Sequence, residues 1–269
     1  MKLKWSILRH ELYLNRKTLL VWVLVMAGLM AIFAGFAGMV IESSEDLLVV
    51  LKAYPKALLD AFNFSTMSFA SPEGWIASEP YLFLALLSAC FAAVMAGSTV
   101  SREIDKKTGE FLFALPVTRR SIYYTKALSH LIMLTVVVIL GAAAAYGVVA
   151  AGFELTNAGG LLLVLLSAYP VSLAAGGVGY LVTSLVDSEK NAMFIGIGFV
   201  LVSLFLKTMA AFGKSLEWLG NFSIFEAFDS NAILASGSLP VLGIVILVAI
   251  YVVGLIVGGE ILVRKNLTM

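Results

Sequence analysis

The sequence has little of what most enzymes use to build a catalytic centre. Only 13% of the 269 residues are charged, whereas soluble proteins average roughly 25%. The single cysteine, Cys90, excludes an internal disulfide bond. The two histidines, His10 and His130, lie far apart, and neither has a second histidine or a cysteine at the spacing of a metal site. We therefore expect no metal site and no catalytic residues.

Recognisable nucleotide-binding and hydrolase motifs are also absent. Gly213-Lys214-Ser215 resembles the end of a phosphate-binding loop, but that loop needs a glycine five positions before the Gly-Lys pair, where this chain has Thr208. We expect the chain not to bind a nucleotide by itself.

Apolar residues dominate instead, at 61% of the sequence with a mean hydropathy of +0.99. A membrane-spanning helix needs about 20 mostly apolar residues, and six segments qualify: 18–41, 80–101, 127–152, 158–186, 192–212 and 239–263. The first is too long for a cleaved signal peptide. The sequence predicts an all-α polytopic membrane protein, with residues 1–269 as one transmembrane domain.

The positions of lysine and arginine predict the orientation. Fourteen of the eighteen lie before the first span, in residues 102–126, at Lys190 or in the tail after the sixth span. Such residues accumulate in cytoplasmic loops. We expect a multi-pass protein of a prokaryotic cell membrane with both termini cytoplasmic.

Three segments are predicted to depart from simple spans. Residues 1–17 alternate basic and apolar side chains, which favours a helix lying in the membrane interface; the alternative is a disordered basic tail. Residues 213–238 are too apolar for a solvated outer loop, so we expect a re-entrant pair of short helices. Pro170 is a candidate kink or break in the long fourth span.

A few residues within the spans are candidates for packing or function. Gly254 and Gly258 have the Gly-x-x-x-Gly spacing that lets helices approach closely, either within the subunit or between subunits. Glu260 and Lys207 are ionisable residues inside predicted spans and so are candidate functional charges. Both lie close enough to an end of their span to reach the interface.

Residues 102–126 form the one long charged interruption between two spans. Glu103 and Glu110 are seven residues apart and would share a helix face, Phe111 begins an apolar run, and Pro116 would end the helix. Such a helix suits insertion into a groove of a partner protein. The alternative is an ordinary positively charged loop.

This loop resembles that of the membrane (permease) subunits of ABC transporters of the ABC-2 type exporter family. The resemblance rests on Arg102-Glu103, Lys107-Thr108-Gly109-Glu110-Phe111-Leu112, Leu115-Pro116-Val117-Thr118-Arg119 and Lys126.

The resemblance implies a coupling helix in this loop that docks on a separate soluble ATPase. Glu103, Glu110, Phe111, Pro116 and Arg119 are the implied coupling residues. The ATPase would bind ATP and Mg²⁺, and a second permease copy or a paralogue would complete the transporter. Substrate would pass along the permease dimer interface, drawing on spans two and five, and no nucleic acid is implied.

Other functions remain as alternatives. An ion-coupled secondary carrier would need a charge relay in mid-membrane, and an intramembrane enzyme would need clustered titratable residues. A passive scaffold would leave the docking loop without a role. The substrate is an apolar or amphipathic molecule in our first hypothesis and an ion in the alternative.

Overall fold

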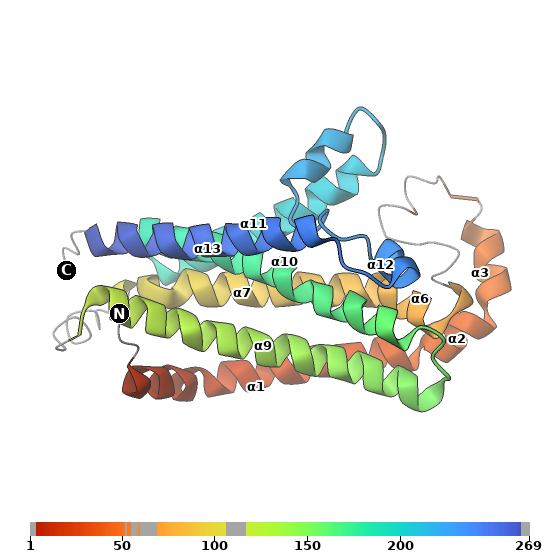
Figure 1. The fold of residues 1–269 in the computed structure, drawn as a ribbon, viewed down its shortest axis with the longest axis horizontal. Helices are drawn as coiled ribbons and strands as arrows, with labels where there is room; N and C mark the ends of the chain where they lie inside the picture. The colour runs from red at the N-terminus through yellow and green to blue at the C-terminus, as the bar shows by residue number, and fades with distance from the viewer. Residues whose placement is uncertain (1–3, 52, 55–58, 60–68, 106–116, 265–269) are drawn as a thin grey trace.

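The computed structural model describes residues 4–51, 53–54, 59, 69–105 and 117–264. Long helices lie side by side in a bundle, and short helices gather at one end of it (Figure 1). The long helices are α1 (Trp5–Gly35), α7 (Glu79–Asp105), α9 (Arg119–Gly152), α10 (Ala158–Leu185), α11 (Glu189–Ala210) and α13 (Val241–Arg264). The short ones are α2 (Ala37–Glu42), α3 (Ser44–Leu51), α6 (Pro72–Ala77), the 3₁₀ helix η1 (Glu217–Phe222) and α12 (Ser230–Ser236).

Six helices of the described chain are long and apolar enough to cross a membrane. They coincide with the six predicted spans, which confirms the all-helical membrane fold. The start of α1 and the end of α13 lie at the same end of the bundle (Figure 1).

The centre of the bundle is the pair α7 and α10. Helix α10 packs against α7 on one side and α13 on the other, while α11 packs on α7 and α1 on α9. Glycines set the closeness of these contacts. A Cβ atom on Gly254 of α13 would collide with the backbone of Gly177 of α10, and one on Gly179 would lie 2.7 Å from the carbonyl oxygen of Ala93 in α7. The backbones therefore approach each other directly, as small residues permit in membrane helices.

The predicted separate interfacial helix at 1–17 is wrong in one respect: it is continuous with the first span. Helix α1 runs unbroken from Trp5 to Gly35. The reason is that one face of its first turns packs on the bundle, where Glu11 and Asn15 are buried. Because these first turns are held against the bundle, α1 continues directly into the first span.

One boundary and one candidate break differ from the sequence prediction. Helix α9 begins at Arg119, eight residues before the predicted third span, after Thr118 accepts a hydrogen bond from the Ser121 amide as N-cap. Helix α10 passes through Pro170 without a break. A proline removes one backbone hydrogen bond, and α10 is packed against both α7 and α13.

The region predicted to be re-entrant contains two short helices. The end of α11 and η1 project from the side of the bundle, whereas α12 lies beside α6 at the end opposite to the start of α1 (Figure 1). Entry of these helices into the lipid stays a prediction.

Candidate functional site: a buried charge network

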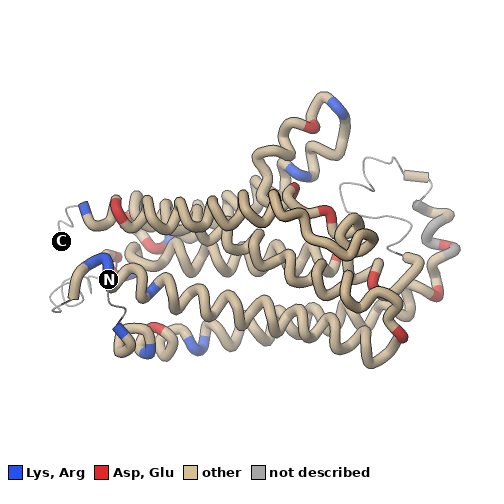
Figure 2. Tube along the Cα trace, in the orientation of Figure 1, with Lys and Arg blue, Asp and Glu red and all other residues tan. Residues whose placement is uncertain are grey.

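Charged residues gather toward the ends of the bundle, and its long middle part carries almost none (Figure 2). Lysine and arginine are concentrated at the end where α1 begins and α13 ends (Figure 2). We call this the charged end. Helices α7 and α9, which flank residues 106–116, stop and start here.

Lys126 is the centre of the charged end. It lies two turns into α9, and its side chain is only 4% exposed. Its ammonium group is 2.8 Å from Oε1 of Glu103 in α7 and 3.0 Å from Oε1 of Glu11 in α1. A lysine buried at this depth needs such partners, because an unpaired charge away from water is strongly unfavourable. One ammonium group thus joins three helices.

Arg102 extends this network to a fourth helix. Its Nε donates to Oε1 of Glu189 in α11 at 2.8 Å, and its Nη1 donates to Oδ1 of Asn15 in α1 at 3.0 Å. Asn15 in turn donates from Nδ2 to the Glu11 carbonyl oxygen, one helical turn away. Asp105, at the end of α7, accepts a hydrogen bond from the Glu189 amide at 3.2 Å. The charge network, defined as Glu11, Asn15, Arg102, Glu103, Lys126 and Glu189, therefore links α1, α7, α9 and α11.

A separate ion pair reaches α13. Arg120 Nη2 in α9 lies 2.7 Å from Oε2 of Glu260, but these side chains are 53% and 39% exposed. Exposed pairs contribute little to stability.

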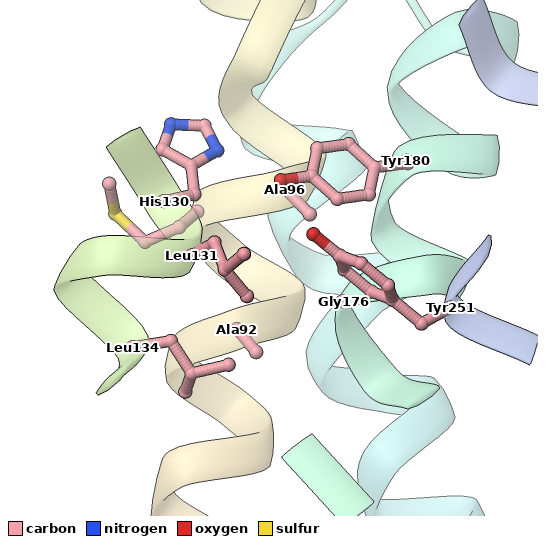
Figure 3. Close-up of a pocket in the computed structure, with 9 residues that line it drawn as sticks. Ala92, Ala96, His130, Leu131, Leu134, Gly176, Tyr180 and Tyr251 are labelled. Carbon is pink, nitrogen blue, oxygen red and sulfur yellow. The ribbon is translucent and has the colours of Figure 1, made fainter. Parts of the chain in front are cut away.

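A cluster of polar aromatic residues lies next to the charge network, further toward the middle of the bundle. His130, one turn beyond Lys126, is buried, and its Nδ1 is 3.4 Å from the Thr99 hydroxyl of α7. Its ring stacks on that of Tyr180 from α10, which also contacts Tyr251 of α13 edge to face. His130, Tyr180 and Tyr251 line a cavity of about 10 Å³ between α7, α9, α10 and α13 (Figure 3). This volume is roughly the room that one water molecule needs.

A larger groove opens beside the charge network on the outside of the bundle. Its volume is about 260 Å³ and it lies between the end of α7 and the first turns of α11. Asp105, Glu189 and Lys190 form its charged rim, and Met193, Phe194 and Ile197 supply its apolar wall. The groove thus combines an ionic end with an apolar body.

The structure brings together part of the predicted coupling set. Glu103 belongs to the charge network, and Arg119 lines a small cavity next to Glu103 and Lys126. Glu110, Phe111 and Pro116 lie outside the described residues.

The other predicted residues lie elsewhere. Gly254 and Gly258 pack inside the subunit against Gly177 and Tyr180 of α10. Glu260 pairs with Arg120 at the charged end, and Lys207 lies near the other end of α11, partly buried. Within the described residues there is no group of three or more histidine, cysteine or acidic side chains able to hold a metal ion.

Sequence reasoning missed five of the six members of the charge network as site residues: Glu11, Asn15, Arg102, Lys126 and Glu189. A weak signal was present, because Glu11 and Asn15 are four residues apart and so share a helix face. The partners of Glu11 and Asn15 lie about ninety residues or more away in sequence. The spacing of residues along the chain does not indicate contacts over such separations.

Comparison with protein families agrees with the resemblance of residues 102–126 to ABC-2 permeases. The family described as ABC-2 family transporter protein matches residues 5–224, which covers the first five spans and all six residues of the charge network. The chain belongs to the ABC-2 transporter family. It is therefore a multi-pass membrane subunit of an ABC transporter and not itself the catalytic subunit. No curated protein sequence matches the chain.

Proposed function

We propose that this permease is driven by a separate ATPase subunit that docks at the charged end, and that the charge network transmits the ATPase movement to the membrane helices. The observation that carries the proposal is the double ion pair of Lys126 with Glu11 and Glu103. Residues 106–116 connect two helix ends that are both anchored in or next to this network. A displacement of that loop would act on α7 and α9 at once and, through Lys126 and Arg102, on α1 and α11.

The proposed cofactors belong to the partner. ATP and Mg²⁺ bind to the ATPase, on the cytoplasmic side, which makes the charged end and both termini cytoplasmic. The accumulation of lysine and arginine at this end supports that orientation.

We further propose export of an apolar or amphipathic molecule along an interface with a second permease. Span five offers such a surface, because α11 exposes Phe194, Leu201, Val202 and Phe205. Span two does not, because α7 is largely buried within the subunit. The groove between α7 and α11 lies at the start of this surface, and its charged rim and apolar wall suit an amphipathic cargo.

The first test is purification of the tagged chain from native membranes with identification of bound proteins. We expect a stoichiometric soluble ATPase that is lost when residues 106–116 are scrambled in a chain that still inserts. Recovery of the chain alone, under conditions that preserve other membrane complexes, would contradict the proposal and favour an ion-coupled carrier.

The second test addresses transmission. Spin labels at Arg9→Cys in α1 and Lys190→Cys in α11, in a Cys90→Ala background, report the distance between two exposed positions on helices joined by the network. We expect ATP with vanadate to change this distance in the complex. Glu103→Gln should abolish the change while retaining the ATPase, and Glu260→Gln is the matched control outside the network. An unaltered distance change in Glu103→Gln would refute transmission through the network.

A further inference from the structure

A second set of polar contacts lies at the end of the bundle opposite to the charged end, and its centre is one buried carboxylate. Glu73 lies in the short helix α6 and is 2% exposed. Its Oε1 accepts hydrogen bonds from the Thr156 amide at 2.6 Å, the Thr156 hydroxyl at 3.1 Å and the Asn157 amide at 3.0 Å. These donors form the turn between α9 and α10, so Glu73 fixes that turn to α6.

The same turn is joined to α12, and α12 is joined back to α6. Asn157 Nδ2 donates to the carbonyl oxygen of Leu234 in α12 at 2.5 Å. The Ser230 hydroxyl, in the first turn of α12, donates to the carbonyl oxygen of Ala77 at the end of α6. The three elements therefore form a closed ring of hydrogen bonds, which we call the end ring.

Glu73 uses only one of its two carboxylate oxygens to hold the turn. All three donors converge on Oε1, while Oε2 is buried without a partner among the described residues. A buried polar atom without a hydrogen bond is unusual in a native protein. The arrangement therefore holds the turn through one carboxylate oxygen and leaves the other buried and unbonded.

The position of Glu73 connects the end ring to the charge network. A single residue, Ser78, separates α6 from α7. At its far end α7 carries Arg102 and Glu103, both of which take part in the charge network. Since α7 is a continuous helix, a shift or rotation imposed at the charged end is carried to α6 and to the hydrogen bonds of Glu73.

We propose that Glu73 is a releasable latch that keeps the end of the permease opposite to the ATPase closed until α7 moves. The latch rests on the proposed function in one respect, because ATP supplies the movement that releases it. Glu73 acts here as a positioning residue: it holds the α9–α10 turn and α12 over the end of the bundle and lets them separate during each cycle.

Amide hydrogen exchange on the chain in lipid nanodiscs tests whether Glu73 holds the ring, and it needs no partner. In Glu73→Ala, we expect peptides covering 153–160 and 230–236 to exchange about ten- to a hundredfold faster, the factor that corresponds to a lost hydrogen bond to a charged group. Glu73→Gln should exchange like the parent chain because its amide oxygen accepts from the same donors. Glu154→Ala, an exposed carboxylate on the same turn, is the matched control. Parental exchange in Glu73→Ala would refute the latch.

Reversible cross-linking tests whether the latch must open. Glu73→Cys and Thr156→Cys, in a Cys90→Ala background, are joined with a short bis-methanethiosulfonate reagent in the complex with its ATPase. We expect ATP hydrolysis to fall to background and to return after reduction. Hydrolysis at the unlinked rate by the cross-linked complex would show a static cap and overturn the proposal. Failure to recover any ATPase refutes the proposed function instead, while the exchange measurement still decides whether Glu73 holds the ring.

Discussion

The two ends of this permease solve the burial of polar groups in different ways. At the charged end, the charges of Lys126 and Arg102 are paired with carboxylates from other helices. At the opposite end, the Glu73 carboxylate is held by neutral amides and a hydroxyl, and one of its oxygens is left without a described partner. The first end joins long helices, whereas the second joins a short helix, a turn and another short helix.

This difference predicts how each end responds to perturbation. Removing one member of a buried ion pair leaves its partner as an uncompensated charge. Removing a carboxylate held by neutral donors leaves unpaired but uncharged groups, which costs less. Disrupting the charged end should therefore cost more free energy than opening the opposite end.

The largest effect is expected for Lys126→Met. It leaves the buried Glu11 and the partly buried Glu103 side by side without their cation, so the free energy of unfolding should fall by about 3–5 kcal/mol. Thermal unfolding in nanodiscs measures the loss. Lys190→Met, an exposed lysine at the same end, is the control. Equal stability of the two variants would show that Lys126 is not the centre of this end.

A substitution in the contact between α10 and α13, which lies between the two ends, should affect hydrogen exchange at both ends. In Gly254→Ala, the added methyl group meets the backbone of Gly177, which no side-chain rotation can relieve. We expect a loss of about 3 kcal/mol, the upper part of the range for overpacking, with faster hydrogen exchange along α10 and α13. Gly147→Ala in α9 has open space around the new methyl group and should be stabilised by up to about 1 kcal/mol. Faster exchange at one end alone would show that the ends are not coupled through α10.

Glu73→Ala should have a smaller effect on global stability than either change above. Loss of the carboxylate acceptor should lower the free energy of unfolding by about 2 kcal/mol, while Glu73→Gln should restore most of it. Chemical or thermal unfolding of the three chains gives the comparison. A loss as large as that of Lys126→Met would contradict the proposed contrast between the ends.

Much of the architecture follows from the sequence because lipid imposes simple rules on it. Uncharged apolar runs long enough to span a bilayer form transmembrane helices. The asymmetry of lysine and arginine indicates which helix ends lie on the cytoplasmic side of the membrane. The six spans were therefore predictable, and the loop between the second and third identified the family. The start of α9 was missed because Arg119 and Arg120 look like loop residues, although Thr118 provides a good N-cap.

The contacts of the candidate site were less predictable than its location. Glu103 was predicted from the family pattern, but its pairing with Lys126 depends on how α7 and α9 lie against each other. Glu11 looked like part of a helix on the membrane surface, and only the packing of α1 on α9 turns it inward. Glu73 gave no signal at all, since an acidic residue in an outer loop normally points to solvent and its partners lie more than eighty residues away.

The smallest effect is expected for the Arg120–Glu260 pair, which lies at the charged end but outside its buried network. Its atoms are as close as those of Lys126 and Glu103, at 2.7 Å against 2.8 Å, yet both side chains remain open to solvent. If distance alone mattered, breaking either pair would lower the free energy of unfolding equally. Because this pair is exposed, Arg120→Ala should lower it by less than about 1 kcal/mol. Added salt should reduce even this contribution, because mobile ions screen exposed charges more than buried ones. Unfolding of Arg120→Ala and Lys126→Met at low and high salt therefore separates the two explanations: similar losses would mean that proximity, and not exclusion of water, determines the strength of the ion pairs at this end.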